Sequence, residues 1–332
     1  MTEIMRKLIN KRNIALFGTL VLLVILPLFF KNNYITVALV TCFSYAALGT
    51  SWNIIGGYAR QTSWCHAAFM AIGAYSGMIL YKSFNTSPFI SLFVGIVLTV
   101  IFAFIIGNAC FRLNGMFFSI STIAFLELCR ILLLYFNDFT GGSNGMFVSY
   151  KGDSFWHLQF GNDKPYYYIM LTVMIFSLFV SYLVNKSKMG YYLKGIRDDE
   201  IAAEFLGINI HRIKLKAFII SAALTSVIGT FYGFFVTYID PTSVCSMDIS
   251  LRIGMVALIG GVGTLWGPII GAFLLILLTQ FMNTVFGSQA NGISTLLFGL
   301  VLMIIVIFKP GGIITLFQKK DKTVNKVQRG KA

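Results

Sequence analysis

The chain has 332 residues, of which 57% are hydrophobic and only 11% are charged. A soluble domain averages about half apolar and about a quarter charged residues, so this composition excludes an ordinary water-soluble protein. The formal net charge of +14 would suit nucleic acid, but the basic residues gather in short segments between apolar runs. We therefore interpret the charge as membrane topology and expect no nucleic-acid partner.

Long apolar runs in chain order predict membrane-spanning helices. A helix needs roughly 17–25 such residues to cross about 30 Å of hydrocarbon, and these runs lack the alternation of barrel strands. The first run follows a basic arm but has no small-residue cleavage site, so we expect it to remain as a span. We predict an all-α polytopic bundle of about 8–10 helices within a transmembrane domain at 14–308. The runs cover residues 14–30, 34–55, 64–81, 89–111, 116–136, 166–184, 217–239 and 293–308.

The distribution of charge predicts which segments share a side of the membrane. The arm at 1–13 holds four Lys and Arg residues, and the segments at 185–216 and 309–332 hold seven each. The segment at 137–165 has two Lys against three Asp. By the positive-inside rule, the three basic segments are cytoplasmic and the segment at 137–165 is external.

Two apolar regions are interrupted. Residues 56–63 combine two glycines with polar side chains, and a Gly-Pro segment divides residues 252–283 into a half-length helix, a turn and a second helix. Paired broken segments indicate an inverted repeat with a substrate route between the halves. Close helix packing through small residues is the alternative. The helix-break or packing residues are Gly260, Gly261, Gly263, Gly267, Pro268 and Gly271.

Polar residues beside the first break are candidates for the route. Their side chains could offer hydrogen bonds to a zwitterion or an amide in transit, although a lone histidine beside a helix start is more often structural. The route candidates are Gln61, Ser63, His66, Phe69 and Thr122.

Ionisable residues within the apolar runs form spaced pairs. Glu127 and Arg130 lie three residues apart, and therefore on one helix face. Such groups are functional candidates because their isolation in lipid is costly. We favour a local pair that neutralises itself near the outer interface, and expect the same of Asp248 and Arg252.

A cytoplasmic stretch at 190–209 has the features of a short exposed helix. Asp199 and Glu200 precede a helix-forming run, where carboxylates complement the helix amino terminus, and Gly207 can end it. Ala202 and Ala203 give the run a small-residue face suited to a groove on another protein. A solvated connector is the alternative.

The same stretch resembles the coupling loop of importer permeases, in the version typical of LivM-type branched-chain amino-acid permeases of the ATP-binding-cassette class. The resemblance covers roughly residues 45–313, and no single motif carries it. The family usually has glycine where Arg60 stands, and leucine and glycine at Trp64 and Cys65, so substrate size preference can differ here. The matching motifs lie at 61–75, 112–125, 140–145, 190–209, 214–222, 241 and 260–272.

The resemblance implies a type II importer-like permease in a bacterial inner membrane, with both termini cytoplasmic. Its implied partners are a second homologous permease subunit, two ATP-binding subunits, an extracytoplasmic substrate-binding protein and the lipid bilayer. The five cysteines lack metal or redox spacing, and no phosphate-binding Gly-x-x-x-x-Gly-Lys-Ser/Thr motif occurs in the sequence. We therefore expect no cofactor, no metal and no catalytic residue, with ATP hydrolysed by separate subunits.

The expected substrates are leucine, isoleucine and valine. Urea or short-chain amides are the alternative, because permeases for those substrates share the motifs. An ATP-independent secondary transporter or a membrane-embedded enzyme fits less well, since Glu127 is the one carboxylate well inside an apolar run and the three histidines lie apart.

Overall fold

The computed structural model describes residues 23–27, 33–113, 115–286 and 311–317, with the single positions 296, 299, 300, 303 and 307. The predicted runs at 14–30 and 293–308 lie largely outside the described residues. Within them the elements are α3 (Asn33–Gly56), α4 (His66–Phe84), α5 (Pro88–Cys110), α6 (Met116–Tyr135), α7 (Asn137–Thr140), η1 (Gly142–Asn144), β1 (Met146–Phe147), α8 (Lys164–Lys186), α9 (Lys188–Asp198), α10 (Glu200–Phe205), α11 (Ile210–Val236), β2 (Tyr238–Ile239), α12 (Pro241–Val244), α13 (Met247–Gly261), α14 (Gly267–Phe286) and α16 (Ile314–Phe317).

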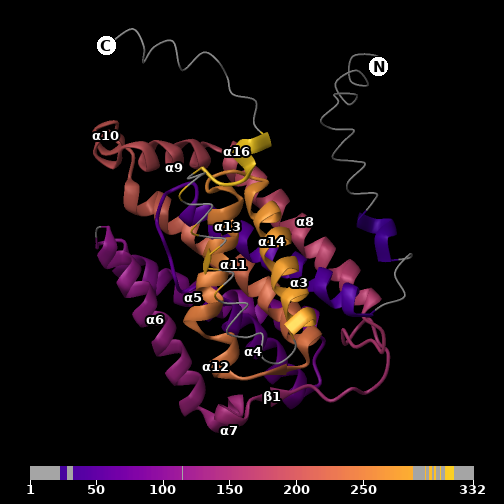
Figure 1. Cartoon of the computed structure of the whole chain (residues 1–332). Helices are drawn as coiled ribbons and strands as arrows, with labels where there is room; N and C mark the ends of the chain where they lie inside the picture. Colours follow the sequence, from indigo (N-terminus) through magenta and orange to yellow (C-terminus); the bar gives the residue numbers. More distant parts are fainter. Residues whose placement is uncertain are drawn as a thin grey trace, which may run out of the picture.

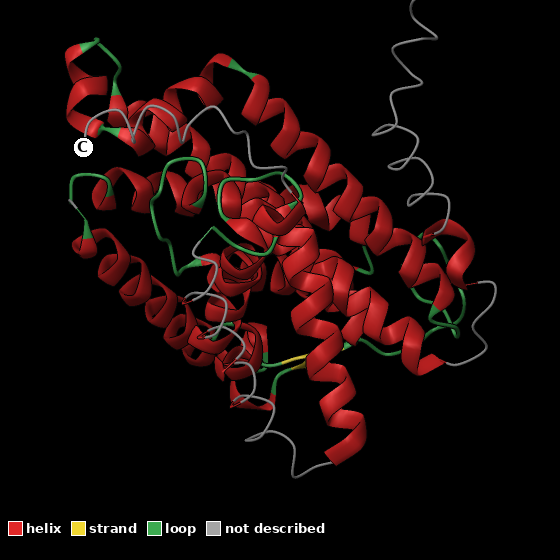
Figure 2. Cartoon of the chain, turned by 45° about the horizontal axis from the view of Figure 1, so that its top comes forward, coloured by secondary structure: helices red, strands yellow, loops and turns green. Residues whose placement is uncertain are grey.

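The architecture is a polytopic helical bundle, as predicted. Among the described residues, six helical segments are long and apolar enough to cross a membrane, with α12 and α13 together forming the sixth. Helix α3 lies at the centre and packs against α8, α11, α13 and α14, while α11 packs against α4 and α5. Figure 2 shows this helical packing, with the short β1–β2 pair as the strands drawn.

Small residues allow the central helices to approach closely. A Cβ added at Gly73 of α4 would lie 2.1 Å from the Ser226 carbonyl oxygen of α11. A Cβ added at Gly271 of α14 would lie 1.9 Å from the Val256 carbonyl oxygen of α13. Backbone contact of this kind is typical of helix pairs in membranes. Lipid supplies no hydrophobic driving force between helices, so close packing through small residues stabilises the pair instead.

The short elements that connect or follow the long helices lie at two opposite ends of the bundle. Helices α9, α10 and α16 lie at one end, while α7, β1 and α12 lie at the other (Figure 1). Strand β1 pairs antiparallel with β2, with Met146 opposite Ile239, and so connects the segment at 137–165 to the loop after α11. The segments at 185–216 and 137–165 therefore lie at opposite ends of the bundle.

Candidate functional site

The predicted coupling segment, residues 190–209, contains most of α9 and all of α10, and the two helices meet at Asp199. The Asp199 carboxylate accepts hydrogen bonds from the backbone amides of Ile201 and Ala202, both at 3.0 Å, and thereby caps α10. Gly207 closes the helix with a φ of +80°, a conformation that glycine adopts without strain. The sequence therefore sets both ends of α10.

The exposed face of α10 differs from the expected one. Ala203 is buried, at 3% exposure, whereas Ala202 is exposed. The apolar exposed side chains are Ile201 at 68%, Phe205 at 88% and the adjacent Leu206 at 82%. Larger apolar side chains therefore make the outward face, and Ala203 packs inward against its own chain.

An ion pair fixes α10 to α11. The Lys214 ammonium lies 2.7 Å from the Glu200 carboxylate, and the lysine side chain is only 6% exposed. Both residues line a cleft of about 300 Å³ at the same end of the bundle. The cleft is also lined by Gln61 from the first break, so it joins α10 to that break. Its lining residues are Gln61, Leu113, Gly115, Glu200, Ile201, Glu204 and Lys214.

The second break lies between α13 and α14. Gly260 and Gly261 end α13, Gly267 and Pro268 begin α14, and Gly263 lies between them with a φ of +76°. Gly271 follows on α14 at its close approach to α13.

Asn53 connects the two broken segments. Its side-chain amide donates to the Thr264 carbonyl oxygen, and its carbonyl oxygen accepts from the Gly263 amide, both at 2.8 Å. Asn53 is fully buried near the end of α3, four residues before the first break begins at Gly57. The Arg197 guanidinium of α9 also reaches this loop, since a Cβ at Gly263 would lie 2.9 Å from its Nη1. Helix α9 therefore touches the second break directly.

His66 belongs to a buried hydroxyl network. Its Nε2 lies 2.8 Å from the Ser221 hydroxyl, which in turn donates to the Ser51 carbonyl oxygen at 2.6 Å. Because the Ser221 proton is used in that bond, Nε2–H must donate to Ser221. Nδ1 then faces the Ser63 hydroxyl at 3.4 Å. Both ring nitrogens of His66 therefore have hydrogen-bond partners inside the protein.

The other route candidates are also enclosed. Thr122 accepts from the Trp64 amide at 3.1 Å and so holds the first break against α6. Phe69 packs edge-on against Phe218, with ring centroids 5.4 Å apart. Ser63, His66, Phe69 and Thr122 all have 0% exposure. These four lie together in the core, whereas Gln61 lies apart in the cleft.

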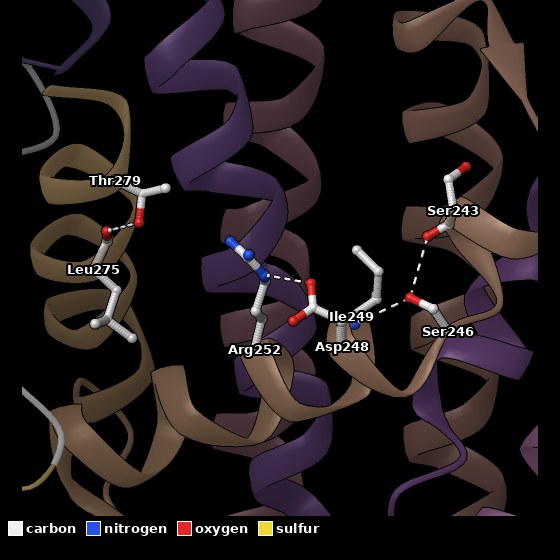
Figure 3. A network of polar contacts seen from close by, with 7 residues as sticks. All are labelled: Ser243, Ser246, Asp248, Ile249, Arg252, Leu275 and Thr279. Carbon is white, nitrogen blue, oxygen red and sulfur yellow. Dashed lines mark hydrogen bonds and ion pairs between the residues drawn. The ribbon is translucent and has the colours of Figure 1, made fainter. Parts of the chain in front are cut away.

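The sixth span begins with two caps in succession. Asp240 accepts from the amides of Thr242 and Ser243 and caps α12. Partial burial raises the pKa of the Asp240 carboxyl, but hydrogen bonds from Ser243 and Thr242 lower it by more, leaving the pKa below its ordinary value. Ser246 then caps α13 by accepting from the Ile249 amide at 3.3 Å (Figure 3).

Both ionisable pairs expected from the sequence make contact. Arg130 Nη2 lies 2.6 Å from Glu127, and Arg252 Nε lies 2.9 Å from Asp248. Figure 3 shows the second pair on one side of α13. Among the described residues, no group of three or more His, Cys, Asp or Glu side chains could hold a metal ion.

Asn53 and Arg197 are two residues of this region that the sequence motifs do not indicate. An asparagine inside an apolar run, just before a Gly-Gly pair, was a usable signal for Asn53. Arg197 gave none, because its contact depends on how α9 folds over the break.

Comparison with known proteins identifies the family. The family model described as "Branched-chain amino acid transport system / permease component" matches residues 34–306. The high-affinity branched-chain amino acid transport system permease protein LivM of Escherichia coli K12 is 27% identical over 96% of this chain and 79% of its own length. LivM of Salmonella typhimurium is also 27% identical, over 94% and 77%. The corresponding permease protein BraD of Pseudomonas aeruginosa is 26% identical over 44% of this chain and 48% of its own. No solved structure matches.

Because the family model covers residues 34–306, this chain belongs to the permease-component family of branched-chain amino acid transport systems.

Proposed function

We propose that this chain is a membrane-embedded subunit of an ATP-driven importer of leucine, isoleucine and valine. The family match over residues 34–306 is the observation that carries the proposal, and relatives named for branched-chain amino acid transport support the substrate class. The chain supplies a route and a coupling surface, and two ATP-binding subunits supply the energy. A second homologous permease and an extracytoplasmic binding protein complete the complex in the inner membrane, with both termini of this chain cytoplasmic.

The contacts of the coupling segment suggest how ATPase motion reaches the membrane. A partner that binds Ile201 and Phe205 can move α10. Because the Glu200–Lys214 ion pair connects α10 to α11, α11 then moves with it. Arg197 passes the movement to the second break at Gly263, and Asn53 continues it to α3. The two breaks then change conformation together, and alternating access between the two sides of the membrane follows.

The test is substrate-stimulated ATP hydrolysis in liposomes. The chain is reconstituted with its candidate permease partner, ATPases and binding protein, and leucine, isoleucine and valine are compared with urea. We expect stimulation by the three amino acids alone. Stimulation by urea alone would reassign the substrate to the urea or amide class, and failure to assemble with any ATPase would refute the importer.

A substitution on α10 tests the coupling surface in the same assay. Phe205→Asp places a charge on the most exposed apolar side chain of the helix, so we expect at least tenfold weaker ATPase co-purification. Phe84→Asp is the matched control, because Phe84 is 72% exposed but ends α4, which runs toward the opposite end of the bundle. Equal losses in both variants would argue against α10 as the docking helix.

A further inference from the structure

The cleft beside α10 brings together parts of the chain that lie far apart in the sequence. Gln61 comes from the first break, Leu113 and Gly115 from the connection between α5 and α6, and Lys214 from the start of α11, while α10 supplies the other lining residues. The volume of about 300 Å³ is at the lower end of the range of roughly 300–1,000 Å³ typical of small-molecule sites. Helix α10 lies with α9 and α16 at one end of the bundle (Figure 1), so the cleft belongs to that end.

The Lys214 ammonium has unused hydrogen-bond donors in this cleft. Its side chain is only 6% exposed, and its Nζ donates to a Glu200 carboxylate oxygen at 2.7 Å. Among the residues that the structure describes, Nζ has no other partner. An ammonium group carries three N–H donors, and burying donors without an acceptor is costly. An anionic oxygen bound in the cleft would accept from the remaining donors.

Glu204 adds an unpaired carboxylate to the same cleft. It follows Glu200 by one turn of α10, so two negative charges lie on one side of the helix and repel each other. Lys214 neutralises Glu200, whereas the described residues provide no hydrogen bond or ion pair to the Glu204 side chain. The Gln61 side-chain amide also has no partner among them. The cleft therefore offers an acceptor for a cation beside donors for an anion.

This combination of charges favours a small zwitterion over a simple ion. A lone anion would be repelled by the two carboxylates, and a lone cation would leave the spare Lys214 donors unused. A free amino acid presents an ammonium and a carboxylate on one carbon, and Leu113 and Ile201 offer apolar surface to an aliphatic side chain. An ethanolamine phospholipid has a similar headgroup, in which a phosphate replaces the carboxylate.

We propose that the cleft binds a free aliphatic amino acid, with its carboxylate at Lys214 and its ammonium at Glu204. The Gln61 amide lies beside both groups as a further donor and acceptor. The bound molecule connects α10 to α11 and to the first break, and it is separate from the buried route candidates. The proposal rests on the proposed function only in taking leucine as the ligand.

A cysteine in the cleft measures its occupancy directly. Leu113 lines the cleft and is 44% exposed, and all five native cysteines are buried, so Leu113→Cys should react selectively with a methanethiosulfonate reagent. The purified chain in detergent is labelled with and without millimolar leucine, and we expect leucine to slow labelling at least threefold. Leucinol, which lacks the carboxylate, and 4-methylpentanoate, which lacks the ammonium, should leave the rate unchanged. Phe84→Cys, which is exposed toward the opposite end of the bundle, should be labelled equally with and without leucine.

A second substitution assigns the protection to the cleft charges. Glu204→Gln in the Leu113→Cys chain removes the partner of the ammonium, so we expect protection by leucine to disappear. Asp198→Asn is the matched control, because Asp198 is also an exposed acid, at 71%, but does not line the cleft. We expect full protection in this control.

Four outcomes would overturn the site. They are no protection by leucine, equal protection by either analogue, protection that survives Glu204→Gln, and protection by added phosphatidylethanolamine but not by leucine, which would assign the cleft to a lipid headgroup. The assay uses the chain alone, so its failure leaves uptake by the assembled complex unaffected. Failure of the proposed function would appear instead as a complex that takes up no branched-chain amino acid.

Discussion

Asn53 connects the two broken segments by side-chain hydrogen bonds. Asn53→Leu keeps the branched shape of the side chain but removes both hydrogen bonds to the Gly263–Thr264 loop. The loop then loses partners for one amide and one carbonyl, so we expect a loss of about 1–3 kcal/mol in unfolding free energy. Thermal unfolding in detergent measures the difference.

Thr50→Val on the same helix is the control for Asn53→Leu. Thr50 is fully buried, but among the residues that the structure describes its hydroxyl bonds only to the Ala46 carbonyl one turn earlier, at 2.7 Å. We expect the control to cost less than Asn53→Leu. Equal costs would show that Asn53 contributes only as a buried polar residue and not as a link between segments.

At the scale of single elements, substitutions at Asp199 distinguish the effect of the capping hydrogen bonds on α10 from the effect of the negative charge. Asp199→Ala removes the acceptor of two amides and should destabilise the helix by about 1 kcal/mol. Amide hydrogen exchange in α10 should therefore become roughly fivefold faster. Asp199→Asn keeps a capping oxygen without the charge, and we expect near-parent exchange. Fast exchange in both variants would assign the effect to the charge.

The α13–α14 pair gives a second test at this scale. Gly271→Ala places a Cβ 1.9 Å from the Val256 carbonyl oxygen, and since backbone must move apart, we expect a loss of about 1–3 kcal/mol. Gly195→Ala is the control, because a Cβ there meets nothing within 4 Å and alanine favours the α9 helix. Thermal unfolding should show opposite shifts for the two variants; a neutral Gly271→Ala would mean that α13 and α14 are not held this closely.

The sequence predicted helices and breaks better than it predicted contacts. Apolar length and glycine placement gave the spans and the interruption around residue 263, because these depend on hydrocarbon thickness and local backbone chemistry. The burial of Ala203 and the reach of Arg197 depend on how α9 and α10 fold back over the bundle. Helix periodicity alone could not decide whether Ala203 or Phe205 faces outward, since both sides of so short a helix contain apolar residues.

For the whole molecule, the basic segments predict which end faces the cytoplasm, and two matched cysteines test that prediction. Glu204 lies on α10 and Asp138 on α7, both exposed acidic residues at opposite ends of the bundle (Figure 1). All five native cysteines are buried, so background labelling should be low. In right-side-out vesicles, an impermeant maleimide should label Asp138→Cys at once and Glu204→Cys only after permeabilisation. The basic segments predict this order, because Lys and Arg are retained on the cytoplasmic side. Immediate labelling of Glu204→Cys alone would invert the topology and place α10 beyond the reach of any ATPase.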